Sequence, residues 1–327
     1  MPQESKEMKR QIIKKEIEKA LMKDVDIPEN IGMTVVKKVM RNNREKQQEK
    51  DPLPLWLSLW YEGEVCCLFA DSNVGKSIYA VQIANEIAKK EIVIYFDFEL
   101  SGKQFQMRYT DEKGNLYPLQ DNLYRAEFNP ESLDDTDFDE ALMKTIEDCY
   151  KQTHAKVMVI DNLSFLCNES EKGDAAGTLM RNLTALKKKY GLSLLVIAHT
   201  KKRIESNPIT ANDLNGSKRL FNFFDSAFTI GKSAKGENLR YIKQLKARYG
   251  GFEYGSRNVI VSRIEKTNGF LHFENTGCGF ENDHLRELSR EDIIREAKDL
   301  RLQGKTQREI ADIVGKSTSW VNSKIKS

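Results

Sequence analysis

The stretch EVCCLFADSNVGKSIYAVQIA, residues 64–84, decides how this chain folds. Its first part, residues 65–69, is a short apolar run with the β-branched and aromatic character of a buried strand. A polar turn follows, and from Ile78 onward apolar side chains recur at helical spacing. The stretch therefore predicts a strand, a loop and a helix in direct succession.

The loop has the composition of a phosphate-binding loop. In such a loop, backbone N–H groups at a helix N-terminus converge on the β-phosphate, a lysine neutralises the β- and γ-phosphates, and a serine hydroxyl binds Mg²⁺. The usual pattern begins with glycine, and alanine stands there in this chain; alanine is tolerated where φ is negative. The alternative is a solvated turn that happens to contain Gly-Lys-Ser. The residues expected to bind the nucleotide are Ala70, Asp71, Ser72, Asn73, Val74, Gly75, Lys76, Ser77 and Ile78.

Two further apolar runs end in acidic residues. Residues 92–98 form a near-continuous apolar run that is followed by Glu99, with Asp97 just before it, and residues 156–161, KVMVID, close with Asp161. Runs of this kind are typical of buried parallel strands. We expect Asp161 to hold Mg²⁺ together with Ser77, usually through water. Alone, four apolar residues and a carboxylate occur often by chance, so this prediction depends on the phosphate loop.

The strands and helices continue to alternate after these runs. A strand expected at residues 192–198 leads to His199, which would face the ligand crevice of an open α/β sheet; the alternative is a surface histidine on a basic loop. Lys246 and Arg248 follow a later strand, and Arg248 could simply pack its stem there or pair with a nearby acid. A turn at residues 268–269 predicts a hairpin. The pattern as a whole predicts an α/β fold with a mostly parallel sheet flanked by helices.

The two ends of the chain read as additions to one core. Residues 1–51 predict an N-terminal helical extension: an amphipathic helix over residues 4–24, with its apolar stripe at Ile13, Ile17, Ala20 and Leu21, and then a linker or second helix. Residues 52–284 form the core. Residues 285–327 have the pattern of a small C-terminal helix-turn-helix domain, with Gly315 in the turn; the alternative is a helical bundle for protein contact. The residues expected to face DNA are Lys316, Ser317, Thr318, Ser319, Asn322 and Lys324.

Composition limits the class of protein. The chain has 327 residues, 39% hydrophobic and 31% charged, which is enough for one large core with small appendages. It has no apolar run long enough to span a membrane, no secretory signal, and five cysteines without metal-ligand spacing, so we expect a cytoplasmic protein with no membrane partner. The net charge of +3 is uneven: residues 1–50 hold 13 Lys/Arg against 9 Asp/Glu, and residues 285–327 hold 10 against 7. The basic ends favour a nucleic acid or protein partner there.

Taken together, residues 53–275 resemble the RecA-like ATPases, in particular the plasmid RepA and DnaB-type helicases. The resemblance rests on ADSNVGKS, FDFELS, VMVID, AHTKK, DLNGS and LKARYGG in this order. It implies ATP and Mg²⁺ as ligands, Glu99 as the residue that polarises the attacking water, and His199 as the sensor of the γ-phosphate. It also implies that Lys246 and Arg248 reach the nucleotide of a neighbouring subunit in a homo-oligomeric ring, typically a hexamer. Residues 290–327 resemble the helix-turn-helix of resolvases.

The leading hypothesis is therefore a cytoplasmic, Mg²⁺-dependent, oligomeric ATPase acting on DNA in the replication, mobilisation or recombination of a mobile element, with helicase activity as one form of that action. A second hypothesis is an ATP-gated DNA-binding regulator without unwinding activity. A third is a RecA-like ATPase that remodels proteins and does not touch DNA. The basic ends and the C-terminal pattern favour the first two.

Overall fold

The computed structural model describes residues 11–15, 30–32, 34–127, 138–162, 175–201, 203–215, 218–286 and 290–325. The chain divides into two compact units, Met1–Asp51 and Pro52–Ser327. In the described part of the chain, none of the helices combines the length and the apolar character that crossing a bilayer requires.

The described residues of the first unit are mostly exposed. Residues 11–15 are helical, and the side chains of Ile12 and Ile13 are more than half exposed. The rest of the predicted apolar stripe lies outside the described residues. The short strands β1 (Asn30–Ile31) and β2 (Thr34–Val35) pair antiparallel, and α2 (Val39–Gln47) buries none of its residues. The segment after residue 24, for which the sequence predicts a linker or a second helix, therefore contains a helix.

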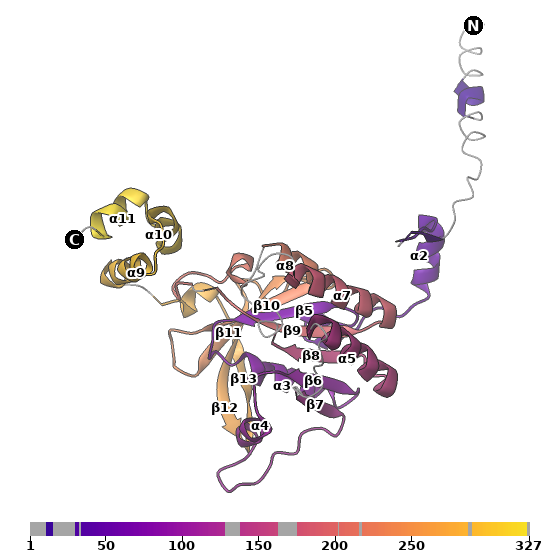
Figure 1. The fold of residues 1–327 in the computed structure, drawn as a ribbon, viewed down its shortest axis with the longest axis horizontal. Coiled ribbons are helices and arrows are strands. Elements are labelled where there is room, and N and C mark those ends of the chain that lie inside the picture. Colours follow the sequence, from indigo (N-terminus) through magenta and orange to yellow (C-terminus); the bar gives the residue numbers. More distant parts are fainter. Residues whose placement is uncertain are drawn as a thin grey trace. The chain divides into compact units, whose positions relative to one another are not determined.

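The second unit alternates strands and helices, as the sequence predicts (Figure 1). Its helices are α3 (Lys76–Ile87), α4 (Gly102–Arg108), α5 (Phe138–Thr153), α7 (Ala175–Tyr190) and α8 (Lys218–Phe223), with short 3-10 turns η3 (Ala211–Asp213) and η4 (Glu281–His284). Its strands are β3 (Pro54–Trp56), β4 (Trp60–Tyr61), β5 (Val65–Ala70), β6 (Val93–Asp97), β7 (Leu123–Glu127), β8 (Val157–Asp161), β9 (Ser193–His199), β10 (Ser226–Lys232), β11 (Leu239–Lys246), β12 (Val259–Thr267) and β13 (Phe270–Gly279).

Nine of these strands form one sheet, in the order β13-β12-β11-β10-β5-β9-β8-β6-β7. Every pair from β10 to β7 is parallel, and the pairs from β10 to β13 are antiparallel. The expected α/β fold with a mostly parallel sheet is therefore confirmed. Because parallel strands end at the same edge, β5, β6, β8 and β9 bring Ala70, Asp97, Asp161 and His199 to one side of the sheet.

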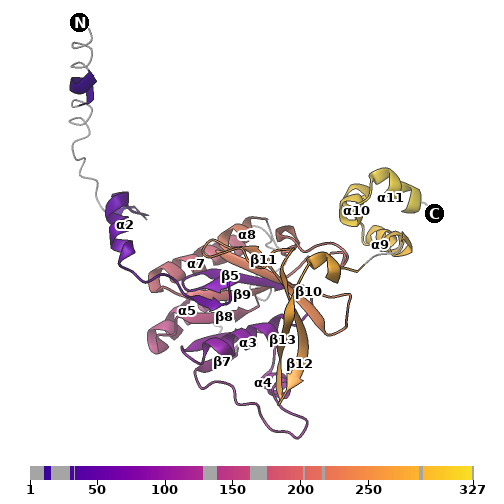
Figure 2. The same cartoon turned by 180° about the vertical axis from the view of Figure 1, so that it is seen from behind.

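Two layers of helices cover the sheet (Figure 1, Figure 2). The odd-numbered residues of β5 pack into an apolar cluster with α5, α7 and α8, and the even-numbered residues pack into a second cluster with α3. All six residues of β5 are fully buried. This is why its sequence reads as a continuous apolar run and not as an alternation.

The hairpin of β12 and β13 packs against α3. Asn268 and Gly269 have φ values of 51° and 87°, the left-handed conformations that a two-residue hairpin turn requires. The side-chain amide of Gln82 in α3 accepts from the backbone N–H of Phe273 (2.8 Å) and donates to its carbonyl (3.1 Å). The helix that begins at the phosphate loop is thus fixed to a hairpin almost two hundred residues away in sequence.

Three helices close the chain: α9 (Arg290–Leu302), α10 (Gln307–Val314) and α11 (Thr318–Ile325). Thr306 and Glu309 form a reciprocal capping box at the start of α10, and Gly315, with φ of 64°, ends it. The helices share an apolar cluster that includes Ile310 and Val321 and also Ile204, from the segment after β9. Gly315 lies in the turn between α10 and α11, as the sequence pattern predicts.

Candidate active site

The phosphate loop joins β5 to α3. Asn73 and Gly75 both adopt left-handed backbone conformations, with φ of 61° and 103°. A Cβ on Gly75 would lie 3.0 Å from side-chain atoms of Ile264 and Phe273 in the hairpin, so this position needs glycine both for its backbone and for space. The first turn of α3 leaves N–H groups without intrahelical acceptors, which is the arrangement that binds phosphate.

Ala70 takes the place of the usual first glycine without disturbing the loop entry. It is the last residue of β5, it is fully buried, and it is not among the residues with positive φ. It stays paired with His199 of β9 on one side and Ile230 of β10 on the other. The extended backbone directs its methyl group into the apolar cluster with α3, so the strand tolerates a Cβ here.

Lys76 holds a buried positive charge that no acid contacts directly. Its Nζ donates to the carbonyl oxygens of Ala70 (3.1 Å) and Asp71 (2.9 Å) and lies 3.1 Å from Nδ1 of His199. Among the residues that the structure describes, no carboxylate forms an ion pair with it. Burial lowers the pKa of Lys76, and the carboxylates of Asp161, Glu99 and Asp71 act in the opposite direction. Neutral oxygen and nitrogen atoms thus hold the ammonium group in place, and a bound phosphate would replace them as its hydrogen-bond partners.

Asp97, the last residue of β6, and Glu99, two residues further on, have different surroundings. Asp97 is 3% exposed; its carboxylate accepts from Arg125 Nε (2.9 Å) and from the backbone N–H groups of Glu99 (3.1 Å) and Leu100 (2.9 Å). The side chain of Glu99 is 41% exposed and points to the His199 ring, with Nε2 to Oε1 at 3.6 Å. Asp97 therefore shapes the turn, and Glu99 is the carboxylate that remains available for chemistry.

His199 connects the lysine to the glutamate. Nδ1 of His199 lies 3.1 Å from Nζ of Lys76, and Nε2 lies 3.6 Å from Oε1 of Glu99 and 3.2 Å from Nδ2 of Asn162. The interaction with His199 lowers the pKa of Glu99, the charge of Lys76 adds to the effect, and burial opposes it. The side-chain amide of Asn162 also donates to Glu99. Asn162 was not predicted as a site residue, although its position directly after Asp161 indicates that it lies near the site.

Asp161 and Ser77 fit a hard cation. Oδ2 of Asp161 accepts from the Tyr95 hydroxyl at 2.6 Å, and Oδ1 is buried and has no hydrogen-bond partner among the described residues. Burial raises the pKa of the Asp161 carboxyl to about 6, and the hydroxyl groups of Tyr95 and Ser77 oppose that rise. An unsatisfied buried carboxylate oxygen close to a serine hydroxyl is the kind of oxygen donor set that Mg²⁺ prefers.

Arg203, which was not predicted as a site residue, contacts the phosphate loop. Nε of Arg203 donates to Oδ2 of Asp71 at 3.2 Å, and the Thr200 hydroxyl donates to the other oxygen. The guanidinium group also donates to the carbonyl oxygens of Ile204 (3.1 Å) and Asn207 (2.8 Å). Arg203 therefore joins the loop to the segment that follows His199. No short-range pattern reveals a partner 132 residues away.

Lys246 and Arg248 do not approach the phosphate loop of their own chain. Lys246 ends β11, and its Nζ donates to backbone carbonyl oxygens that include that of Asn222, at 3.4 Å. Arg248 donates to the carboxylate of Asp225 at 2.9 Å and to the carbonyl oxygen of Asn222 at 3.1 Å. In the single chain, Arg248 thus makes the pairing with a nearby acid that the alternative hypothesis expects, although its side chain is still 58% exposed.

The residues expected to face DNA differ in exposure. Residues 316–319 are exposed, whereas Asn322 and Lys324 are half-buried. The Ser317 hydroxyl accepts from the backbone N–H of Trp320 at 3.2 Å, so Ser317 has a structural role at the start of α11. Exposed polar side chains before α11 agree with a binding surface but do not identify its partner.

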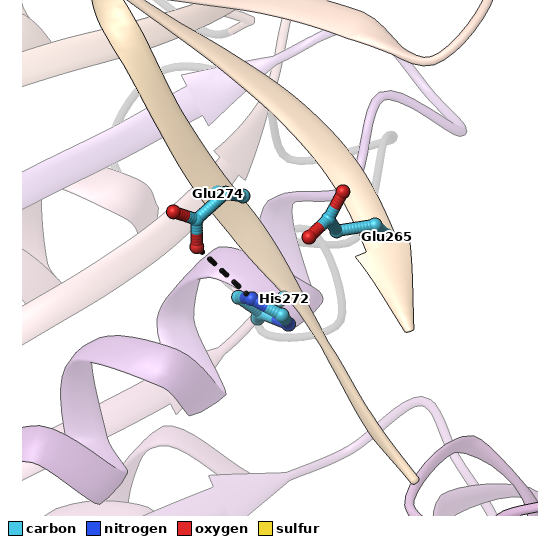
Figure 3. A group of neighbouring side chains, drawn as sticks. All are labelled: Glu265, His272 and Glu274. Carbon is cyan, nitrogen blue, oxygen red and sulfur yellow. Dashed lines mark hydrogen bonds and ion pairs between the residues drawn. The ribbon is translucent and has the colours of Figure 1, made fainter. Parts of the chain in front are cut away.

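The β12–β13 hairpin carries a separate group of ionisable side chains, Glu265, His272 and Glu274 (Figure 3). Their nearest ligand atoms lie within 4.8 Å of one another, a spacing that could hold a metal ion. His272 Nδ1 lies 3.0 Å from the Phe270 carbonyl oxygen, and Nε2 lies 3.3 Å from Glu274. The Glu274 side chain is 58% exposed, and carboxylates this exposed often gather without a metal. We interpret the group as cross-strand pairing that stabilises the hairpin.

The raised pKa of Asp161 predicts that its carboxylate, which suits a metal ion, lowers the stability of the metal-free protein. Its folded-state pKa of about 6 lies above the ordinary 3.8, so the carboxylate destabilises the fold, by about 3 kcal/mol, once the pH exceeds 6. We expect Asp161→Asn to raise the free energy of unfolding in EDTA at pH 7.5 by about 1–3 kcal/mol. The gain should shrink as the pH falls from 6 to 4, where the wild-type carboxyl is protonated. Urea denaturation at several pH values measures both effects.

Asp97→Asn is the matched control for this experiment. It removes an acceptor that Arg125 and two backbone N–H groups use, so it should lower stability at pH 7.5. If Asp161→Asn were destabilised to the same extent as Asp97→Asn, Asp161 would be a structural acid and not a metal ligand awaiting its cation.

Comparison with known proteins agrees with this geometry. The model of one protein family, described as AAA domain, matches residues 37–205, or 169 of the 327 residues. A search of curated proteins finds no match for the chain. The matched segment contains Lys76, Glu99, Asp161 and His199 but not Lys246 or Arg248. Because the match covers more than half of its length, the chain belongs to the AAA domain family of P-loop ATPases.

Proposed function

We propose that the protein is a Mg²⁺-dependent, oligomeric ATPase that acts on DNA, in the replication, mobilisation or recombination of a mobile element. One observation carries the ATPase chemistry: His199, at the end of β9, lies between Lys76 of the phosphate loop and Glu99, which follows β6. The basic ends and the resemblance to RepA and DnaB-type helicases support the choice of DNA.

The chemistry follows from the contacts. The N–H groups that begin α3 and the ammonium group of Lys76 bind the phosphates. The phosphates thereby replace the loop carbonyl oxygens as the hydrogen-bond acceptors of Lys76. Ser77 and Asp161 would hold Mg²⁺, which would supply charge neutralisation at the phosphates. Glu99 remains ionised beside His199, so it accepts a proton from the attacking water. His199 contacts both Lys76 and Glu99 and links the γ-phosphate to the base.

The place of Lys246 and Arg248 supports an oligomer. β11 runs antiparallel to β10, so Lys246 pairs with Ala227 near the start of β10, whereas Ala70 pairs with Ile230 near its end. The two cations therefore lie about 10 Å or more along the sheet from the phosphate loop. They cannot serve their own site without a large rearrangement, and a neighbour in a ring, by resemblance a hexamer, is the natural recipient. A cation supplied in trans accelerates hydrolysis about 10³–10⁵-fold in other ATPases and GTPases.

One set of contacts favours the second candidate function, an ATP-gated DNA-binding regulator. The segment that Arg203 ties to Asp71 also reaches the last three helices: Asn207 Nδ2 donates to the carbonyl oxygen of Ile313 in α10 at 3.3 Å, and Ile204 packs into their apolar cluster. A change in the phosphate loop would therefore act on the C-terminal helices through a short chain of contacts. In a regulator, nucleotide binding would control DNA binding by this route.

Substituting the two carboxylates at the end of β6 separates chemistry from structure. Glu99→Gln should still bind ATP but lower the single-turnover hydrolysis rate at least 100-fold, since it keeps the shape of the side chain and removes the base. Its unfolding midpoint should stay within about 2 °C of the wild type, because the glutamate is half-exposed. Asp97→Asn should show the reverse pattern, with lower stability and a smaller loss of rate per folded molecule. Normal hydrolysis by Glu99→Gln would remove Glu99 from the proposed mechanism.

Mixing variants tests whether the site is shared between subunits. Lys76→Ala and Arg248→Ala should each be inactive alone, and an equimolar mixture should recover part of the wild-type ATPase rate, because some junctions join an intact loop to an intact arginine. Lys76→Ala mixed with Glu99→Gln is the matched control. Both of its lesions lie on the same side of a junction, so no junction is intact. Equal background rates in the two mixtures would exclude the shared site.

The DNA dependence of hydrolysis separates the two candidate functions. For the DNA-acting ATPase we expect the ATPase rate per chain to rise with protein concentration and to increase several-fold with single- or double-stranded DNA. A regulator would instead bind duplex DNA in an ATP-dependent manner without displacing a strand. A rate that responds to protein concentration but to no nucleic acid, together with no ATP-dependent binding of duplex DNA, would contradict both and favour protein remodelling.

A further inference from the structure

A cavity of about 590 Å³ lies beside the phosphate loop and is separate from the residues assigned to hydrolysis. The turn between β10 and β11, the loop residue Asn73 and the segment after η4 line it. Four cationic side chains face it against two carboxylates, which leaves a net charge of +2 when the histidine in its wall is neutral. The residues are Lys232, Lys235, Arg240 and Arg286 against Glu205 and Glu237.

Arg240 is the unusual member of this wall. It is only 7% exposed, and its guanidinium group donates to three backbone carbonyl oxygens: Val74 (3.0 Å), Glu237 (2.6 Å) and Leu239 (2.9 Å). Burial lowers its pKa. No carboxylate in the described parts of the chain forms an ion pair with it. The charge of Glu237 opposes the effect of burial, but only neutral carbonyl oxygens accept from the guanidinium group, so an anionic ligand would stabilise this buried cation further.

The other groups around the cavity agree with an anionic ligand. His284 is buried, and its burial and the charge of Lys235 both lower its pKa. The neutral form of the histidine is therefore favoured near neutral pH. Lys232 and Lys235 are about half exposed, and each lies 3.8 Å from its acidic neighbour, Glu205 and Asp283 respectively. Ion pairs this long and exposed contribute little to stability. Both lysines can therefore leave their acidic neighbours and pair with a bound phosphate.

We propose that this cavity binds a phosphate group, and that its source is the backbone of a nucleic-acid strand. The choice of nucleic acid rests on the proposed function; free phosphate or pyrophosphate, which shares the chemistry, is the other source. Lysine and arginine side chains are common phosphate ligands in proteins. Because Arg240 also donates to the carbonyl oxygen of Val74, an anion in the cavity would act on the phosphate loop through one side chain.

The test compares two double variants of the full chain. Lys232→Ala/Lys235→Ala removes the two rim cations, and Lys89→Ala/Lys90→Ala removes the same charge from exposed positions just after α3. A fluorescein-labelled 20-mer of deoxythymidine is the first probe, titrated at several salt concentrations. We expect the rim variant to bind at least fivefold more weakly and to lose about 1.4 from the salt slope, while the control variant resembles the wild type. Basal ATPase and the unfolding midpoint check that both variants are folded.

Pyrophosphate is the second probe, used with all three proteins in a Lys76→Ala background so that the phosphate loop does not contribute. If it raises the unfolding midpoint of the parent and the control but not of the rim variant, while oligonucleotide binding is unchanged, the cavity binds free phosphate. If the rim variant matches the control with both probes, the cavity is not a phosphate site. If the wild type binds no oligonucleotide at all, the DNA part of the proposed function fails, and the pyrophosphate result alone decides on the cavity.

Discussion

The buried ammonium group of Lys76 is the constraint on which the rest of the site depends. Three carboxylates act on it, yet each has another partner: Asp71 accepts from Arg203, Asp161 accepts from Tyr95, and Glu99 accepts from Asn162. If one of them paired directly with the lysine, a phosphate would have to displace an acid from a poorly solvated position. Because neutral oxygen and nitrogen atoms contact Lys76 instead, the charge is held in place and remains available.

Three distant parts of the chain support the phosphate loop. The hairpin side chains of Ile264 and Phe273 would crowd a Cβ at Gly75, Arg240 of β11 donates to the Val74 carbonyl oxygen, and Arg203 pairs with Asp71. The conformation of the loop therefore depends on the whole second half of the core. Nucleotide binding would be transmitted along these same contacts, toward the hairpin, toward the cavity beside β10, and toward the C-terminal helices.

Local patterns predicted the elements well, because periodicity and turn chemistry act over a few residues. The continuous apolar run of β5, the left-handed turn at Asn268 and Gly269, and the buried face of α10 were all visible in the sequence. The contacts that were missed are long-range. The salt bridge of Arg203, the hydrogen bonds of Arg240 and the anchoring of Phe273 by Gln82 depend on strand order and register, which a single sequence does not encode locally. Glu99 was preferred over Asp97 only through the resemblance, because the ion pair that occupies Asp97 involves Arg125, which lies 28 residues away in sequence.

The central position of β5 has a consequence for how the chain is made. The AAA domain match ends at residue 205, but one of the two neighbours of β5 is β10, which begins at residue 226. A chain still emerging from the ribosome therefore exposes one edge of a strand whose six residues are all destined for the interior. An unpaired apolar edge of this kind readily pairs with another chain. Fragments cut at the family boundary should share this tendency to aggregate, and the nascent protein depends on the prompt arrival of β10 to avoid it.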